Sequence, residues 1–150
     1  MIPEYFQFID DVTALDPDRR TIECLAVVPE KSTVFEGHFP GHPLMPGTLL
    51  IETMAQGCGF LILRLLDFER LPFLIQVTRA KLRTFVEPGT KLTVSGTMVH
   101  EGSGFAVAEG RISRDGQPIA DAELRFRTAP FPNPGLQDTV RDWARARGVI

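Results

Sequence analysis

Residues 48–66 constrain the fold of this chain more than any other segment, because their apolar side chains leave almost no polar face. The segment contains no proline and shows no alternation of polar and apolar residues. A helix that is apolar all round is buried within a protein. Glu52, Gln56 and Arg64 make the segment too polar to cross a bilayer. We therefore expect a buried central helix that the rest of the chain must cover. Its apolar residues are Leu49, Leu50, Ile51, Met54, Ala55, Cys58, Leu61, Ile62, Leu65 and Leu66.

The sequence after this helix alternates between polar and apolar residues, as in an antiparallel sheet with one face in water. In residues 120–127 the apolar side chains occupy even positions and the charged ones odd positions. Asp115-Gly116 is a hairpin turn signal, and Glu87-Pro88-Gly89 is a second turn. We expect strands at residues 73–85, 91–100, 104–113 and 119–128.

The sequence before the helix predicts a hairpin followed by an ordered loop. Residues 21–28 are rich in strand-forming residues, and Asp16-Pro17-Asp18 is the expected turn from a short first strand at residues 6–12. Residues 35–47 hold three prolines and three glycines, so we expect no regular structure there. The simplest architecture is α+β, with a curved antiparallel sheet wrapped around one long central helix.

Length and composition predict one domain and exclude several functions. The 150 residues show no break in composition, and a net charge of -3 favours neither nucleic acid nor an anionic membrane as a partner. Cys24 and Cys58 lack the spacing of a zinc site or a disulfide framework, and the N-terminus has no export signal pattern. We expect a cytoplasmic domain over residues 1–130, followed by a linker and a short helical tail over residues 131–150. The linker is expected at residues 131–135, and an amphipathic helix at residues 138–147 is interpreted as a packing appendage.

The candidate chemistry lies in the loop and the first turns of the helix. His38 lies on a loop stiffened by prolines, and Pro46-Gly47 opens the helix with backbone N–H groups that have no partner within the helix. Glu52 is flanked by apolar residues that raise a carboxyl pKa, and Gln56 lies one turn further along the same face. Each feature alone has an ordinary structural interpretation: an exposed or arginine-paired glutamate, a structural histidine, a simple helix cap.

Together these residues resemble a known signature. Gly37-His38-Phe39-Pro40, Pro43, Pro46-Gly47 and Glu52-Thr53-Met54-Ala55-Gln56 are similar to the motif of the beta-hydroxyacyl-ACP dehydratases of the FabZ and FabA type, and the likeness covers roughly residues 5–128. The resemblance implies the hotdog fold. It implies His38 and Glu52 as the catalytic pair, Gly47 as the residue whose N–H binds the thioester carbonyl, and Gln56 as the support of the carboxylate. A glutamate at position 52 favours the FabZ branch.

The resemblance also implies partners and leaves alternatives open. It implies (3R)-hydroxyacyl groups on acyl carrier protein as substrate, no cofactor or metal, and a homodimer whose sites combine histidine and acid from different subunits. The assembly beyond the dimer stays open, with a trimer of dimers as the larger alternative. Arg79, Lys81 and Arg83 recur with period two and are candidates for docking the acidic carrier protein, although a solvated strand face explains them equally well. A hotdog thioesterase and a non-catalytic carrier-binding protein are the alternative functions.

Overall fold

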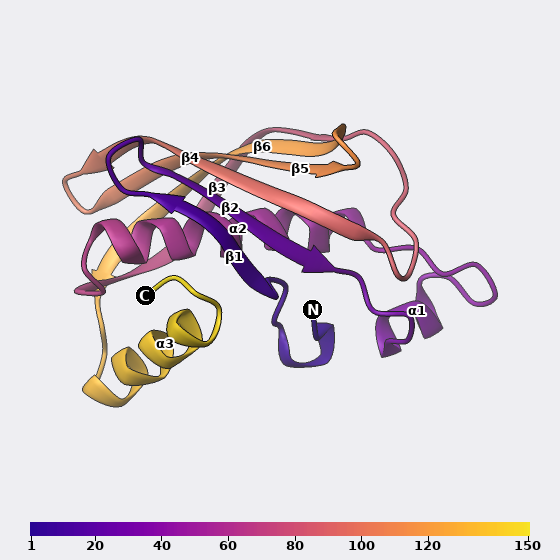
Figure 1. Ribbon diagram of the computed structural model, residues 1–150, viewed down its shortest axis with the longest axis horizontal. Helices are drawn as coiled ribbons and strands as arrows, with labels where there is room; N and C mark the ends of the chain where they lie inside the picture. Colours follow the sequence, from indigo (N-terminus) through magenta and orange to yellow (C-terminus); the bar gives the residue numbers. More distant parts are fainter.

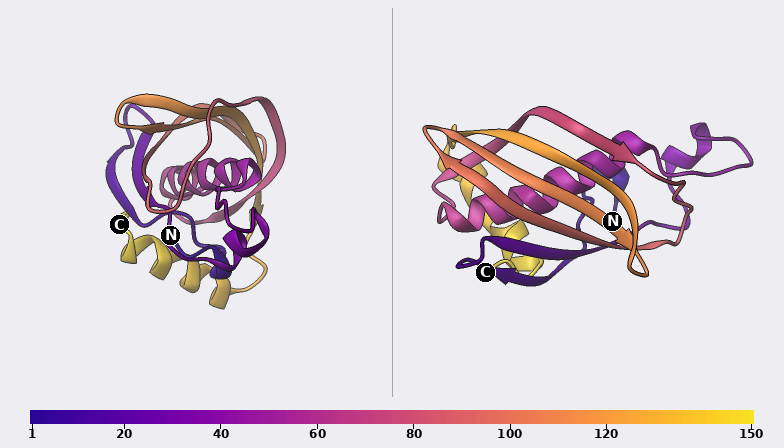
Figure 2. Two further views of the ribbon diagram at one scale, coloured as in Figure 1. Left: turned by 90° about the vertical axis from the view of Figure 1, so that its right-hand side faces the viewer. Right: turned by 90° about the horizontal axis from the view of Figure 1, so that it is seen from above.

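A six-stranded antiparallel sheet curls around one long helix, which is the hotdog arrangement expected from the sequence. The structure is a computed structural model that describes residues 1–150. Figure 1 shows helix α2 lying along the sheet, and Figure 2 shows the sheet curving round it on several sides. In chain order the elements are η1 Pro3–Tyr5, β1 Asp11–Asp16, β2 Thr21–Val27, α1 Thr33–Gly37, α2 Gly47–Leu65, β3 Arg70–Leu82, β4 Lys91–Gly102, β5 Phe105–Arg114, β6 Gln117–Pro130 and α3 Pro134–Ala146.

The sheet order is β1-β2-β4-β5-β6-β3, and every neighbouring pair is antiparallel. The expected opening hairpin and the four strands after the helix are all present. The turns at Asp115-Gly116 and near Gly89 also form, and the backbone at these three residues has the positive φ that tight turns require. Alternation in the sequence therefore predicted the sheet correctly.

Helix α2 is buried because the concave face of the sheet offers small residues where the helix approaches most closely. A Cβ at Gly110 would lie 2.9 Å from the Cβ of Met54, and a Cβ at Gly96 would lie 2.9 Å from the Sγ of Cys58. Met54, Leu61 and Ile62 are fully buried in the resulting core. The helix has the length and hydropathy of a bilayer span, but most of it is buried by the protein itself.

Four expected boundaries were wrong. Strand β3 covers Arg70–Leu82 instead of residues 73–85. The first strand covers Asp11–Asp16 instead of residues 6–12, because Phe6 has a left-handed backbone and Phe8 bonds to a side chain of α2. A short helix, α1, occupies the start of the expected loop, where the Ser32 side chain caps it. In the tail, α3 begins at Pro134, within the expected linker, because the Asn133 side chain accepts a hydrogen bond from the Leu136 N–H and caps it there.

The sheet leaves one side of α2 uncovered, and two segments from opposite ends of the chain lie there. In the end-on view of Figure 2, α3 and the N-terminal segment lie below α2, opposite the sheet. Helix α3 packs through Val140 and Ala144 against Leu63 and Phe68, which form a second small apolar cluster. This arrangement places the C-terminal tail beside the central helix.

Candidate active site

The loop before α2 holds His38 in one orientation. His38 is the C-cap residue of α1. The Leu44 N–H donates a hydrogen bond to the His38 carbonyl at 3.0 Å. The Met45 N–H donates to the Val86 carbonyl at 2.7 Å, which anchors the loop to the segment between β3 and β4. The imidazole stacks on the Phe39 ring with centroids 4.0 Å apart, and the peptide bond between these two residues is cis.

A hydrogen bond decides which nitrogen of His38 can act as a base. Nδ1 lies 3.0 Å from the carbonyl oxygen of Leu44. A carbonyl only accepts, so Nδ1 carries the proton in the neutral ring and Nε2 keeps a free lone pair. The loop therefore presents a half-buried imidazole with Nε2 able to accept a proton.

The start of α2 offers two backbone donors. Pro46 precedes the helix without a side-chain cap, and the N–H groups of Gly47 and Thr48 donate to no protein acceptor. Such N–H groups lie at the positive end of the helix dipole and stabilise an oxygen that gains negative charge. A Cβ at Gly47 would collide with the side chain of Leu82 on β3. The glycine therefore lets β3 lie close to the helix start.

Glu52 is held by Gln56 on the next turn of α2. Gln56 Nε2 donates to Glu52 Oε1 at 2.9 Å and to the Phe6 carbonyl at 2.8 Å, while Gln56 Oε1 accepts from the Phe8 N–H at 2.9 Å. Glu52 makes no ion pair with any basic side chain. Burial raises the pKa of the Glu52 carboxyl, and the hydrogen bond from Gln56 offsets the rise only in part.

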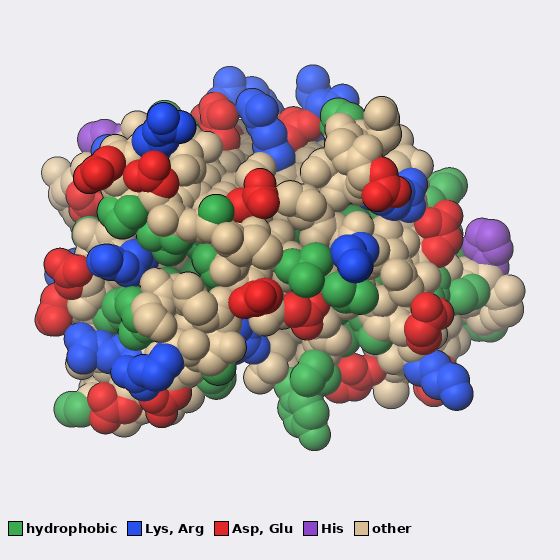
Figure 3. Space-filling view, viewed as in Figure 1, with side chains coloured by type: hydrophobic (Ala, Val, Ile, Leu, Met, Phe, Trp, Pro, Cys, Tyr) green, Lys and Arg blue, Asp and Glu red, His purple; other side chains and the backbone are tan.

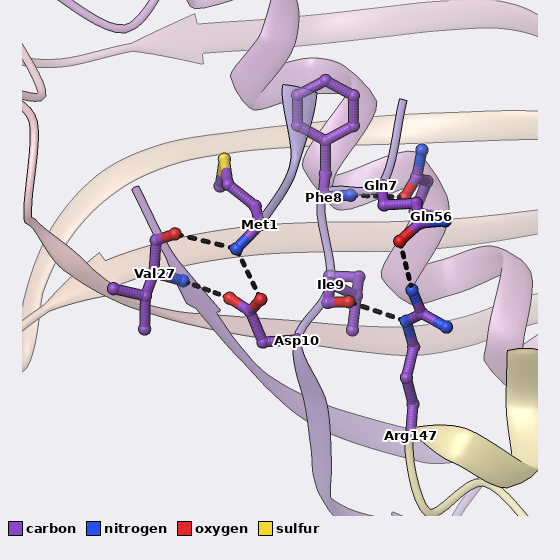
Figure 4. A network of polar contacts seen from close by, with 8 residues as sticks. All are labelled: Met1, Gln7, Phe8, Ile9, Asp10, Val27, Gln56 and Arg147. Carbon is purple, nitrogen blue, oxygen red and sulfur yellow. Dashed lines mark hydrogen bonds and ion pairs between the residues drawn. The ribbon is translucent and has the colours of Figure 1, made fainter. Parts of the chain in front are cut away.

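The N-terminal segment that bonds to Gln56 is itself anchored at two points. Figure 4 shows Asp10 accepting hydrogen bonds from the Met1 ammonium group and the Val27 N–H. It also shows Arg147, just beyond α3, donating to the Ile9 carbonyl at 2.8 Å and to Gln7 Oε1 at 3.2 Å. Residues from both ends of the chain therefore hold residues 6–10, the segment whose backbone bonds to Gln56.

Glu52 and Gln56 line a largely apolar cavity of about 450 Å³. The cavity lies on the side of α2 that the sheet leaves open. Neither His38 nor Gly47 lines it, so a single chain does not bring the expected catalytic pair into one cavity. The full lining is Tyr5, Phe6, Gln7, Glu52, Ala55, Gln56, Gly59, Phe60, Leu63, Leu71, Pro72, Phe73, Leu74, Phe126, Val140, Trp143 and Arg147.

The sequence analysis missed the contribution of both chain ends to this cavity. Tyr5, Phe6 and Gln7 come from the N-terminal segment, and Val140, Trp143 and Arg147 come from α3 and the residue after it. The only available signal was that the single tryptophan of the chain lies in an amphipathic tail helix. Helix α3 packs against the rest of the protein, as expected for an appendage, but it also forms part of the cavity wall.

The three basic residues expected to dock a carrier protein differ in their surroundings. Arg79 of β3 forms an ion pair with Glu123 of β6. Arg83, just after β3, forms one with Asp121 of β6. Lys81 forms no ion pair and is exposed. Acidic and basic side chains are also interspersed on the face drawn in Figure 3.

Groups able to hold a metal ion do not cluster in this chain. Nowhere do three or more His, Cys, Asp or Glu side chains come together in a suitable arrangement. Cys24 and Cys58 are free and buried, and burial raises the pKa of each thiol to about 12. These thiols are therefore protonated core groups near neutral pH. The expectation of a metal-free and cofactor-free protein stays a prediction.

Comparison with known proteins finds similar sequences over most of the chain. The FabA-like domain family matches residues 1–123. A 3-hydroxyacyl-acyl-carrier-protein dehydratase FabZ from Syntrophotalea carbinolica is 32% identical over 134 residues, which cover 87% of this chain and 90% of that protein. The enzyme of the same name from Chlamydia pneumoniae is 33% identical over 133 residues, covering 84% of this chain and 86% of that protein.

Solved structures with the same fold are more distant in sequence. A hypothetical protein from Staphylococcus aureus superposes with a TM-score of 0.66 at 15% identity, covering 85% of this chain and 98% of that chain. A hypothetical thioesterase from Streptococcus pneumoniae, solved with coenzyme A, has a TM-score of 0.64 at 14% identity, covering 80% of this chain and 85% of that one. Likeness at this level of identity shows the fold alone.

Proposed function

The chain belongs to the FabA-like family, and we propose that it is a (3R)-hydroxyacyl-acyl-carrier-protein dehydratase that eliminates water to give a trans-2-enoyl thioester. The observation that carries the proposal is the Glu52–Gln56 pair. A carboxyl whose pKa is raised by burial, held by an amide donor and facing an apolar cavity, is suited to deliver a proton to a leaving group. The relatives named as FabZ dehydratases support the same activity.

In the proposed reaction three groups of this protein act on the substrate. His38 Nε2 takes the proton from the α-carbon, and the Gly47 N–H stabilises the negative charge that develops on the thioester oxygen. The electron pair of the broken C–H bond forms the double bond between the α- and β-carbons. The hydroxyl group leaves the β-carbon with the proton of Glu52, as water. The proton on His38 then returns to Glu52 through solvent, which restores both groups.

We propose that the working unit is a homodimer whose sites combine His38 of one subunit with Glu52 of the other. One reason is that His38 does not line the Glu52 cavity of its own chain. A second is the edge of the sheet, where β3 pairs only with β6 and exposes Phe73, Ile75 and Leu82. An exposed apolar edge strand of this length is an aggregation liability unless a partner covers it. A trimer of such dimers is the larger assembly we expect.

We propose an acidic acyl carrier protein as the partner that delivers the substrate. Of the three candidate residues, Lys81 is the one whose charge is not already paired within the chain, so it is the strongest docking candidate. Arg79 and Arg83 contribute less, because Glu123 and Asp121 largely neutralise them. We place the enzyme in the cytoplasm, in keeping with its two free buried cysteines.

Hydrolysis of the thioester is the alternative enzymatic function that the sequence analysis left open. One assay separates the candidates. The purified protein is incubated with 3-hydroxyacyl and trans-2-enoyl carrier-protein thioesters, and both interconversion of the two and release of free thiol are followed. A dehydratase interconverts them reversibly without thiol release. Release of thiol supports the hydrolase, and no reaction of either kind supports a non-catalytic carrier-binding protein.

The same assay tests the roles of the two reacting residues. We expect His38→Ala and Glu52→Gln each to abolish interconversion while the oligomer, followed by size-exclusion chromatography, stays intact. Arg145→Ala serves as the control, since Arg145 is exposed on α3 and pairs only with Asp142. Near wild-type turnover in either site variant would show that the roles are wrongly assigned.

A further inference from the structure

The cavity beside Glu52 extends along α2 to α3, a helix that lies outside the residues matched by the FabA-like family. Cavity residues from α2 are Glu52, Ala55, Gln56, Gly59, Phe60 and Leu63. Their spacing of three or four residues places them on one face of the helix. The cavity therefore follows that face away from the carboxyl group.

Small residues keep this path open between its two ends. Gly59 lies in the middle, and a Cβ built there would contact only Pro72 Cγ, at 4.0 Å. Ala55 precedes it by one turn. The far end is lined by apolar and aromatic groups, Phe60 and Leu63 from α2 and Val140 and the partly exposed Trp143 from α3. The result is an apolar channel with one carboxyl group at one end and α3 at the other.

Helix α3 is fixed firmly enough to act as a wall. Gln137 Nε2 donates to the Phe68 carbonyl at 2.8 Å near the start of the helix. At its end, Arg147 Nη1 donates to the Trp143 carbonyl at 3.1 Å, and the Arg147 carbonyl accepts from the Val12 N–H at 2.8 Å. Arg147 also bonds to the N-terminal segment that holds Gln56. Helix α3 and the Glu52 carboxyl are thus connected through one hydrogen-bond network.

We propose that α3, through Trp143, ends the acyl channel and determines which acyl-chain lengths the enzyme accepts. From Glu52 to Leu63 the helix rises about 16 Å and an extended chain advances about 1.2 Å per bond, so the channel accommodates an unbranched tail of about a dozen carbons. Substrates with shorter tails leave part of this apolar length unfilled. The inference rests on the proposed dehydratase function in one respect only, namely which carbon of the substrate lies at Glu52.

The test compares wild-type protein with a blocked channel and an opened wall. Gly59→Leu fills the middle of the channel, Trp143→Ala removes its end, and Arg145→Ala is the matched control on α3. For each protein, kcat/KM is measured with enoyl carrier-protein thioesters of about four to about sixteen carbons. We expect Gly59→Leu to lower kcat/KM at least about tenfold for the long chains and less than about threefold for the shortest. Trp143→Ala is expected to shift the optimum to longer chains.

A second readout separates failure of this inference from failure of the proposed function. Trp143 is the only tryptophan, so its fluorescence reports on the wall itself. Titration with long-chain acyl thioesters is expected to change the emission of wild-type protein and not that of Gly59→Leu. If no thioester is dehydrated but the Trp143 emission still changes in wild-type protein alone, the proposed function is wrong and the inference of an acyl channel is supported. If the enzyme turns over but chain preference and emission are the same in Gly59→Leu, the inference is overturned.

Folding of the variants is controlled within the same experiment. Gly59→Ala places a methyl group where only ordinary contact with Pro72 follows, and alanine favours a helix by about 1 kcal/mol over glycine. It is expected to fold at least as well as wild type and to give an intermediate, length-dependent loss. Circular dichroism melting of all variants identifies any that unfold. An equal loss for every chain length in the folded Gly59→Ala protein would also overturn the inference.

Discussion

Gln56 uses both donors and its acceptor in the bonds to Glu52, Phe6 and Phe8. The amide therefore cannot rotate without breaking contacts on two segments. Because its N–H reaches Glu52 Oε1, a proton on the neutral carboxyl resides on the other oxygen, which is available to a substrate. The Gln56 side chain thus fixes both the position of the carboxyl group and the oxygen atom that carries its proton.

Removing that amide changes the pH profile in a defined direction. Burial raises the pKa of Glu52 and the Gln56 bond lowers it, so Gln56→Leu raises the Glu52 pKa further. Activity that needs protonated Glu52 falls as pH rises through this pKa, so the corresponding limb of kcat/KM against pH is expected to move to higher pH. The control is Gln7→Ala, which loosens the same segment without touching Glu52. A limb that stays in place in Gln56→Leu would contradict this assignment.

Glu52 also lowers the stability of the fold near neutral pH. Its folded pKa is raised above the usual 4.5, so the folded state binds the proton more tightly and stability decreases as pH rises from 4.5 through the folded pKa. Glu52→Gln removes this cost, and thermal unfolding at pH 7 is expected to give a higher Tm with no activity. The carboxyl is only half-buried, so solvent screening keeps the gain small. A Glu52→Gln protein whose Tm at pH 7 is no higher than that of wild type would speak against it.

At the scale of elements, the N-terminal turn and α1 depend on one carboxylate. Glu4 of η1 accepts from the Ser32 hydroxyl at 2.6 Å and from the Thr33 N–H at 2.8 Å, at the start of α1. Helix α1 ends at His38, so this contact supports the element that carries the proposed base. The hydrogen bond from Ser32 and those from backbone N–H groups lower the Glu4 pKa to about 2.

This contact predicts a loss of stability in acid that the side chain of Glu4 controls. A carboxyl with a depressed folded pKa contributes its stabilisation above its usual 4.5, and the contribution is lost as pH falls from 4.5 toward 2. Wild-type protein is therefore expected to lose more stability over this interval than Glu4→Gln does. Chemical denaturation at a series of pH values measures the difference. Parallel curves for the two proteins would refute the link.

At the scale of the whole molecule, the exposed β3 edge and the absence of His38 from the Glu52 cavity are complementary observations. The face in Figure 3 also shows hydrophobic side chains projecting over the N-terminal turn, where Tyr5 and Phe6 are exposed beside the cavity mouth. A second subunit that covers the β3 edge would bring a base to the carboxyl group and shield apolar surface at once.

Shared sites predict that two inactive variants restore activity when combined. In a heterodimer of His38→Ala and Glu52→Gln subunits, one site holds both wild-type residues and the other holds neither. Random mixing after joint refolding is expected to recover about a quarter of wild-type turnover, since half the dimers are mixed and each has one intact site. Each variant refolded alone is the control. Recovery of no activity from a mixture proven to contain heterodimers would exclude sites shared between subunits.

Much of the fold could be predicted because periodicity is local. The apolar run of α2 and the alternation in β6 each follow from neighbours along the chain, and the turns at Gly89 and Gly116 follow from glycine. The first strand could not be placed correctly, because Phe6 and Phe8 bond to Gln56, some fifty residues away in sequence. The short helix α1 was hidden by the prolines and glycines that follow it.

The sequence by itself determined the central helix, the sheet around it and the family resemblance carried by the motif of His38, Gly47, Glu52 and Gln56. All three depend only on residue type and spacing along the chain. Only the tertiary structure decided what lies next to them. It brought Trp143 and Arg147 from the C-terminal helix to the cavity of Glu52 and left His38 outside that cavity. Contacts between distant segments depend on how elements pack, and no local pattern records them.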